Sequence, residues 1–114
     1  MVDDDAGSRR AVARVLAEEG YEAATAADGA EAAGMLTSYN PDLVLTDLAM
    51  PRLDGRGLAE RVHTLLPGVP VVMFSGQAGV EAALAAERFG VTAFLAKPFS
   101  FEDLLRQVAT IVGH

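Results

Sequence analysis

The chain has 114 residues, no cysteine and a formal net charge of −7 at pH 7. Its length fits a single domain over residues 1–114, and the absence of thiols excludes a disulfide framework or a thiolate metal site. An acidic surface repels phosphate backbones, so we expect no direct nucleic-acid partner.

Predicted strands and helices alternate along the whole chain. Met1 and Val2 form the tail of a first strand, and further strands are predicted at residues 21–27, 43–45, 71–74 and 92–96. Apolar residues at helical spacing predict helices at residues 7–19, 58–66 and 80–89, one capped by Asp28 that ends near Tyr39, and one after Ser100. This alternation predicts an α/β fold, a five-stranded parallel sheet with helices on both faces.

Polar side chains follow the predicted strands at the point where each strand ends. These residues are Asp3 and Asp4, Asp28, Asp47, Ser75 with Gly76, and Lys97 with Pro98. The carboxyl ends of parallel strands meet at one edge of the sheet, which is where ligands bind in open α/β folds. We therefore expect these groups to lie close together around Asp47.

The residue types at this edge suit phosphoryl transfer. Crowded carboxylates repel one another unless a cation lies between them, and Mg²⁺ accepts one or two carboxylates together with water and a phosphoryl oxygen. Lys97 supplies a point charge for an anionic oxygen, and the Ser75 hydroxyl can donate to another. Asp47 is then the expected nucleophile, since aspartate forms acyl phosphates in covalent catalysis.

In these motifs the chain resembles the receiver domain of two-component response regulators, the CheY-like superfamily. The resemblance rests on Val2-Asp3-Asp4, Asp28-Gly29, Asp47 with Met50-Pro51 and Asp54-Gly55, Ser75-Gly76, and Lys97-Pro98-Phe99. It covers nearly the whole chain and implies a flavodoxin-like (βα)5 fold with strand order 2-1-3-4-5.

The resemblance implies a role for each residue at the edge. Asp47 would accept a phosphoryl group from the phosphohistidine of a sensor histidine kinase or a phosphotransferase domain. Asp4, Asp47 and the backbone carbonyl of Ala49 would bind Mg²⁺, with Asp3 acting largely through a metal-bound water. Lys97 would pair with the phosphoryl group, and the Lys97-Pro98 peptide bond is expected to be cis.

The resemblance also implies a switch that a partner reads. Ser75 would move to bond the phosphoryl oxygen, and Phe94 would rotate into the vacated space. The face formed by the fourth helix, the fifth strand and the fifth helix would then be repacked for a downstream target or a fused output domain. Such a protein is not a turnover enzyme, because it catalyses only its own phosphorylation and dephosphorylation.

The first strand is truncated relative to the family, because only Met1 and Val2 precede the acidic pair. Either the sequence begins late in a longer protein, or a hole lies beside the second and third strands. The hole predicts reduced stability and a less firmly held Asp3 and Asp4. We expect the side chains of Arg9 and Arg10 to face solvent near this acidic edge.

Other functions remain open at this point. The domain could be a phosphorylation-independent interaction module, or the detached C-terminal receiver of a hybrid histidine kinase. A phosphatase of the haloacid dehalogenase type needs a second aspartate where Ala49 stands, and no glycine-rich nucleotide loop follows any strand. The lack of a membrane-length apolar run or a signal pattern favours the cytoplasm.

Overall fold

The computed structural model describes residues 1–3, 5–47, 55–75, 91, 93–96 and 99–112. Seven elements follow one another along these residues: α1 (Ala6–Glu18), α2 (Gly29–Tyr39), β1 (Val44–Asp47), α3 (Gly55–Leu65), β2 (Val71–Ser75), β3 (Ala93–Ala96) and α5 (Phe101–Val112). The helix predicted at residues 80–89 lies outside the described residues.

The three strands form a parallel sheet in the order β1-β2-β3. The predicted strands at residues 1–2 and 21–27 appear only as single bridges, in which Val2 pairs in parallel with both Ala26 and Thr46. A ladder needs consecutive pairs, and the one residue ahead of Val2 is too little chain to form one. Among the described residues the predicted sheet is therefore present as three strands plus a paired residue beside β1, and the five-strand order stays a prediction.

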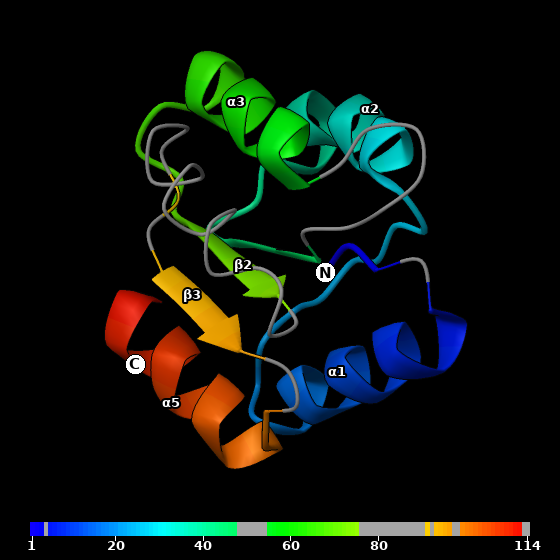
Figure 1. Ribbon diagram of the computed structural model, residues 1–114, viewed down its shortest axis with the longest axis vertical. Helices are drawn as coiled ribbons and strands as arrows, with labels where there is room; N and C mark the ends of the chain where they lie inside the picture. Colours follow the sequence, from blue (N-terminus) through cyan, green and yellow to red (C-terminus); the bar gives the residue numbers. More distant parts are fainter. Residues whose placement is uncertain (4, 48–54, 76–90, 92, 97–98, 113–114) are drawn as a thin grey trace.

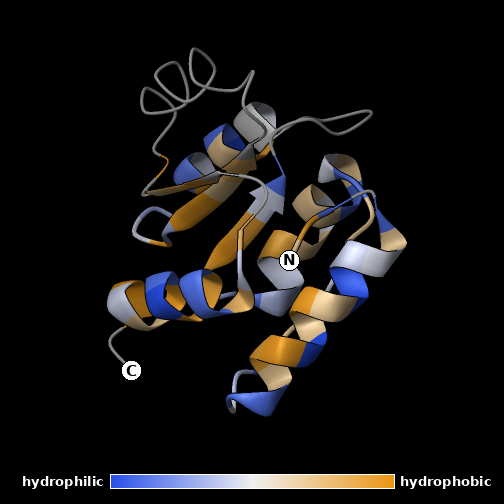
Figure 2. Cartoon of the chain, turned by 60° about the horizontal axis from the view of Figure 1, so that its bottom comes forward, coloured by the Kyte–Doolittle hydropathy of each residue, from blue (hydrophilic) through white to orange (hydrophobic). Residues whose placement is uncertain are grey.

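Helices cover both faces of the sheet (Figure 1), with α2 and α3 on one side and α1 and α5 on the other. Two buried apolar clusters separate along the same lines. One joins α2 and α3 to Val44, Val71 and Met73, and the other joins α1 and α5 to Val72 and Phe74. Alternate residues of β2 thus face opposite sides, as the period of a strand requires. In Figure 2 the strands are mostly hydrophobic, and the helices carry hydrophobic and hydrophilic sides.

Side-chain caps explain where α1 and α2 begin. Asp5 accepts hydrogen bonds from the amides of Gly7 and Ser8 at the start of α1, and Asp28 accepts from the Glu31 amide at the start of α2. These bonds satisfy amides that have no partner within the helix. The predicted cap at Asp28 is confirmed, and so is the end of that helix at Tyr39, where Asn40 adopts a left-handed conformation with φ of 58°.

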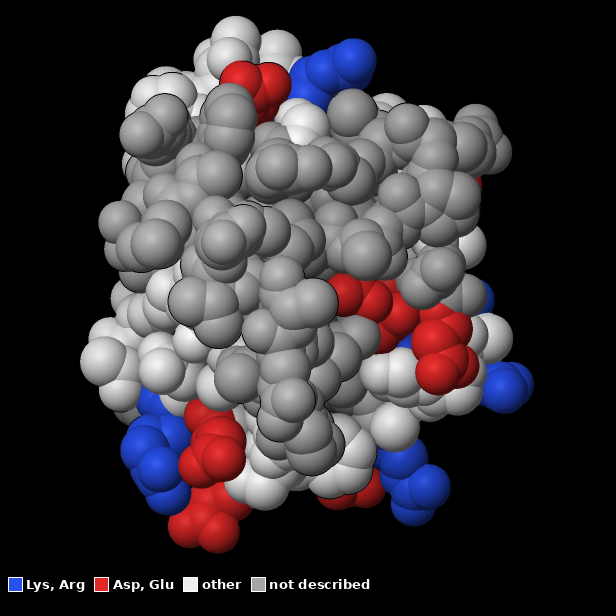
Figure 3. Space-filling model, in the orientation of Figure 1, with Lys and Arg blue, Asp and Glu red and all other residues white. Residues whose placement is uncertain are grey.

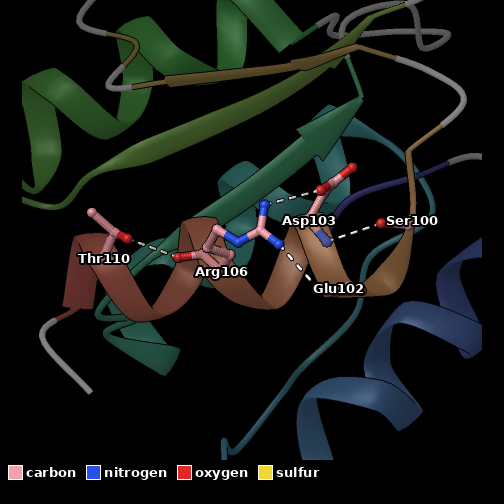
Figure 4. Close-up of polar contacts among 5 residues, drawn as sticks. All are labelled: Ser100, Glu102, Asp103, Arg106 and Thr110. Atoms are coloured by element: carbon pink, nitrogen blue, oxygen red, sulfur yellow. Dashed lines mark hydrogen bonds and ion pairs between the residues drawn. The ribbon is translucent and has the colours of Figure 1, made fainter.

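Helix α5 carries a line of polar contacts on its exposed side (Figure 4). The Ser100 hydroxyl accepts from the Asp103 amide at 3.0 Å and so caps α5, which begins directly after Ser100 as predicted. Asp103 itself bonds Arg106 at 3.3 Å, and Arg106 also bonds Glu102 at 3.2 Å. These side chains are well exposed, so the ion pairs contribute little to stability.

Two boundaries differ from the prediction by more than one residue. Strand β1 runs from Val44 to Asp47, beyond the predicted residues 43–45, because Thr46 and Asp47 are buried although they are polar. Helix α3 begins at Gly55, ahead of the predicted start at Leu58. The prediction was late because the three residues before Leu58, Gly55-Arg56-Gly57, carry no apolar side chain from which the periodicity could be read. No helix among the described residues is long and apolar enough to cross a membrane.

Candidate functional site

Strand pairing places the predicted acids at one edge of the sheet. Val2 pairs with Thr46, so the next residues, Asp3 and Asp47, lie level with each other on adjacent chain segments. Backbone bonds fix this register: the Val2 amide donates to the Leu45 carbonyl at 2.7 Å, and the Asp47 amide donates to the Val2 carbonyl at 2.9 Å. The Asp3 and Asp47 backbones are therefore held side by side at the carboxyl edge of the sheet.

The Asp3 side chain is buried, with 1% of its surface exposed. One carboxylate oxygen, Oδ1, accepts a hydrogen bond from the Asp5 amide at 3.0 Å. The other, Oδ2, is buried and has no hydrogen-bond partner among the described residues. A buried carboxylate oxygen without a donor is costly, so this atom is suited to a cation or to a water held by one.

Asp47 ends β1 and is also buried, with 9% of its surface exposed. The Thr46 hydroxyl donates to the Asp47 carbonyl at 3.0 Å, which ties down the backbone at the tip of the strand. The predicted acceptor carboxylate therefore stands on a rigid strand between two neighbours rather than on a loop. Rigid placement is what a positioned nucleophile requires.

Arg9 contributes to this edge in a way that the sequence analysis missed. Its guanidinium donates from Nη1 to the Asp3 carbonyl at 2.7 Å, and its side chain is half-buried. The prediction that Arg9 faces solvent is therefore wrong, whereas Arg10 is exposed as expected. A signal was present in the sequence, since a cation in the first turns of α1 stands only six residues after Asp3.

The remaining predicted residues lie farther along the same edge or outside the described chain. Ser75 ends β2 and pairs with Ala96, the last residue of β3, so the chain reaches the edge directly before Lys97. Five predicted residues lie outside the described residues: Asp4, Ala49, Gly76, Lys97 and Pro98. The predicted cis Lys97-Pro98 bond and the roles of these side chains stay predictions.

Two aromatic residues lie in and just after β3, namely Phe94 within the strand and Phe99 beyond its end. Phe94 is half-buried and packs against the apolar cluster on the α2 and α3 face. Phe99 packs on Phe74 from the other face, with ring centroids 4.8 Å apart and planes at 32°. Phe99 thus anchors the chain just after residues 97–98. Phe94 in this position serves the core, and its predicted rotation stays a prediction.

The donor set at the edge fits a hard divalent cation. Asp3 and Asp47 supply carboxylate oxygens in parallel neighbouring segments, and Mg²⁺ prefers such ligands. Within the described ranges no three acidic or histidine side chains form a ready cage. A Mg²⁺ site here would need water and the predicted Asp4 and Ala49 ligands, which is consistent with the many waters that this ion retains.

Comparison with known proteins agrees with this geometry. The family model described as the Response regulator receiver domain matches residues 1–109. The chain is 32% identical over 114 residues to the DNA-binding transcriptional regulator NtrC of Escherichia coli strain K12, covering 100% of this chain and 24% of NtrC. It is also 32% identical over 112 residues to the response regulator MprA of Mycobacterium avium, covering 98% of this chain and 49% of MprA.

Solved structures give the same answer. The receiver domain of NtrX from Brucella abortus superposes with a TM-score of 0.92 at 35% identity, covering 98% of this chain and 95% of that domain. The chemotaxis protein CheY4 of Vibrio cholerae superposes with a TM-score of 0.90 at 30% identity, covering 96% of this chain and 93% of CheY4. The chain belongs to the response regulator receiver domain family, and it spans 24% of NtrC and 49% of MprA.

Proposed function

We propose that this domain accepts a phosphoryl group on the Asp47 carboxylate and passes the signal to a partner surface. The observation that carries the proposal is the pairing of Val2 with Thr46, which sets buried Asp3 beside buried Asp47 at the carboxyl edge of the sheet. In the proposed reaction an Asp47 oxygen attacks the phosphorus of a phosphohistidine, the new O–P bond forms, and the P–N bond breaks as imidazole leaves.

Mg²⁺ would be held by Asp3, Asp4, Asp47 and the carbonyl of Ala49, and it would neutralise charge on the phosphoryl oxygens. The chain's own residues would then do the positioning. Arg9 holds the Asp3 backbone. The Asp5 amide binds Oδ1 of Asp3, which would leave Oδ2 for the cation or its water. Lys97 and Ser75 would contact the phosphoryl group, with Ser75 and Phe94 as the switch pair.

We also propose the five-strand order 2-1-3-4-5 for the complete sheet. Its support is that Val2 lies between Ala26 and Thr46, because this is the position of a first strand between the second and third. The partners we propose are a sensor histidine kinase or phosphotransferase domain upstream, in the cytoplasm, and a downstream target or fused output domain. The domain would catalyse only its own phosphorylation and dephosphorylation.

The test uses acetyl phosphate and Mg²⁺ with the intact chain, followed by mass spectrometry. We expect a gain of one phosphoryl group, and we expect Asp47→Asn to lose it completely because the amide is not a nucleophile of the required kind. Asp42→Asn is the matched control, since Asp42 is exposed and lies near the opposite end of the same strand. No gain in the unaltered chain, or a gain that persists in Asp47→Asn, contradicts the proposal.

A phosphorylation-independent interaction module is distinguished by a second titration. Beryllofluoride with Mg²⁺ mimics the phosphorylated aspartate, and amide shifts are followed by nuclear magnetic resonance. The proposal expects shifts at Asp47 that extend to the amides of β3 and α5. Amides that do not respond at all would instead support the interaction module.

A further inference from the structure

The Arg9 guanidinium lies at the acidic edge of the sheet, but it binds a backbone carbonyl there. Its Nη1 donates to the Asp3 carbonyl at 2.7 Å. Among the described residues, no carboxylate forms an ion pair with Arg9. Arg9 therefore leaves the negative charge of the Asp3 side chain available to another cation and acts on the backbone instead.

The start of α1 brings the Arg9 side chain back to Asp3. Asp5 caps the helix by accepting from the Gly7 and Ser8 amides. The Arg9 amide donates to the Asp5 carbonyl at 2.9 Å, so Arg9 stands on the first turn of a capped helix. Long side chains on a helix point back toward its N-terminus, which is the direction of Asp3. The half-buried guanidinium is thus placed by rigid local structure.

The carbonyl that Arg9 binds lies just beyond the last paired residue of the first segment. The Asp3 amide donates to the Ala26 carbonyl at 3.2 Å, which completes the single bridge between Val2 and Ala26. No strand pairing of residues 1–3 extends past this bridge and the one to Thr46. Arg9 supplies a donor at the point where the pairing stops. Because a peptide unit is planar, holding the carbonyl also limits rotation of the chain after Asp3.

These bonds surround a side chain that has one oxygen without a partner. The Asp3 backbone is held by Ala26 and Arg9, and Oδ1 accepts from the Asp5 amide at 3.0 Å. With the backbone and Oδ1 both held, rotation of the carboxylate is restricted and Oδ2 keeps one direction. Oδ2 is buried and has no partner among the described residues. A ligand atom held in this way loses little conformational freedom when an ion binds.

We infer that Arg9 is a positioning residue for the proposed Mg²⁺ site: it holds the Asp3 carbonyl, keeps Oδ2 of Asp3 directed for the ion or its water, and thereby raises the affinity for Mg²⁺. This inference rests on the Mg²⁺ site of the proposed function. Groups that orient a metal ligand without touching the ion commonly change metal affinity by about 10–100-fold. In this role Arg9 touches neither the ion nor the phosphoryl group, so its effect belongs to Mg²⁺ binding and not to the transfer step.

Arg9 has two effects on a bound cation, and they have opposite signs. The charge of the guanidinium repels Mg²⁺, so the charge alone weakens binding. The bond to the Asp3 carbonyl orients a ligand and strengthens binding. We expect orientation to dominate, because water and salt screen the repulsion around a half-exposed side chain, whereas the bond acts directly at 2.7 Å. The direction in which the affinity changes when Arg9 is removed therefore separates the two effects.

The test measures the Kd for Mg²⁺ of the unphosphorylated chain, from the amide signals of Thr46 and Asp47 in nuclear magnetic resonance as magnesium chloride is added. Arg9→Leu removes both donor and charge, and we expect its Kd to be about tenfold higher than that of the unaltered chain. Arg9→Lys should recover most of the affinity, because an ammonium group also donates to a carbonyl.

Arg10→Leu is the matched control, since it removes the same charge from the neighbouring, exposed residue. Its Kd should change by less than about twofold, because an exposed charge is screened by salt. Circular dichroism first shows that each protein is folded. If Arg9→Leu does not fold, Arg9→Gln takes its place and should give the same rise in Kd. Its side chain is neutral and two bonds shorter, and it suits a helix.

The outcomes separate this inference from the proposed function. If the variant without the Arg9 cation binds Mg²⁺ as tightly as the unaltered chain, or more tightly, the inference is overturned and the proposed function stands. An equal loss of affinity in Arg10→Leu also overturns the inference, because the effect would then not depend on the bond to Asp3. No response of the unaltered chain to Mg²⁺ overturns both. Binding that weakens in Arg9→Leu, with no phosphoryl gain in the unaltered chain, supports the inference and contradicts the proposed function.

The rate of phosphorylation by acetyl phosphate gives a second readout. At limiting Mg²⁺ we expect Arg9→Leu to react about tenfold more slowly than the unaltered chain, in line with its weaker binding. At saturating Mg²⁺ the two rates should be equal, because only the binding of the ion has changed. A purely structural role of Arg9 would leave the Mg²⁺ dependence of the rate unaltered, and that result overturns the inference. A rate that stays low at saturating Mg²⁺ also overturns it, because Arg9 would then act in the transfer step.

Discussion

At the scale of single residues, the Asp3 position depends on contacts from three directions. Its amide bonds the Ala26 carbonyl at 3.2 Å, its carbonyl accepts from Arg9, and its side chain accepts from the Asp5 amide. The expectation that a short first strand would leave Asp3 loosely held is therefore not what the described contacts show. Side-chain and neighbouring bonds replace the ladder that a longer strand would have provided.

Replacing Arg9 with leucine should lower the free energy of unfolding by about 1 kcal/mol. The lost bond is charge-assisted and its acceptor is the backbone of a buried residue, but the arginine is only half-buried, so the effect falls at the lower end for such bonds. Urea unfolding measures it. Arg10→Leu is the matched control, because Arg10 is exposed, and it should change stability by less than about 0.5 kcal/mol. Equal effects of the two substitutions would contradict the role of Arg9.

The buried Met1 amine predicts a pH dependence of stability. Its pKa falls from 8.0 in the unfolded chain to about 6 in the fold, so between pH 8 and pH 6 the unfolded state binds more protons. Stability should therefore rise as the pH increases from 6 to 8, by about 2–3 kcal/mol, and this contribution should be flat outside the window.

Acetylation of the Met1 amine isolates this contribution. The acetylated chain has no titrating group at the N-terminus, and its other ionisable groups are the same as those of the free chain. Urea unfolding at several pH values measures the free energy of unfolding of both chains. The difference in this free energy between the two chains should become smaller as the pH rises from 6 to 8. Parallel pH profiles for the free and acetylated chains would show that the amine is not buried in solution.

At the scale of elements, the helix starts are set by local side-chain caps. Asp5, Asp28 and Ser100 each accept backbone amides at the first turn of α1, α2 and α5. These contacts span two or three residues, so they are encoded in adjacent sequence. That locality explains why the starts of α2 after Asp28 and of α5 after Ser100 were predicted correctly. The start of α3 was predicted too late because Gly55-Arg56-Gly57 carry no apolar side chain.

Ser100→Ala should destabilise the protein by about 1 kcal/mol through the loss of the cap on α5. Ser100→Asp should retain most of the stability, since an aspartate oxygen also accepts from the Asp103 amide and favours a helix N-terminus. Thermal and urea unfolding of the three proteins measure the effect. If alanine and aspartate are equally destabilising, the cap is not the source of the stability.

At the scale of the whole molecule, β2 joins the two apolar layers. Met73 faces the cluster with α2 and α3, while Val72 and Phe74 face the cluster with α1 and α5. Each helix layer is therefore held against the same central strand. On the face of the molecule that Figure 3 draws, the acidic and basic side chains of the described residues lie in small separate groups, without a broad basic patch.

Substitutions in both layers should lower the same cooperative transition. Leu58 in α3 and Leu104 in α5 are fully buried on opposite faces, and either leucine replaced by alanine should cost about 2–5 kcal/mol. Leu65→Ala is the control in α3, because Leu65 is 47% exposed, and it should cost well under half as much. Circular dichroism and hydrogen exchange should report one shared midpoint for each protein. Separate transitions for the two layers would contradict a single core.

The sequence by itself determined the class of fold, the order of the elements and the edge at which Asp3, Asp47 and Ser75 gather. These features follow from apolar periodicity, capping residues and the positions where strands end, all of which are local. The same information identified the family that the comparisons confirm.

Only the tertiary structure decided the bond from Arg9 to Asp3, the burial of the Met1 amine, and the Asp3 oxygen that has no partner among the described residues. Each depends on segments that are distant in sequence, such as residues 21–26 and 41–45, and on the desolvation that their packing produces. Burial and non-local pairing are properties of the assembled chain, so no local pattern encodes them. For that reason the groove between residues 21–26 and 41–45 is defined only in the folded molecule.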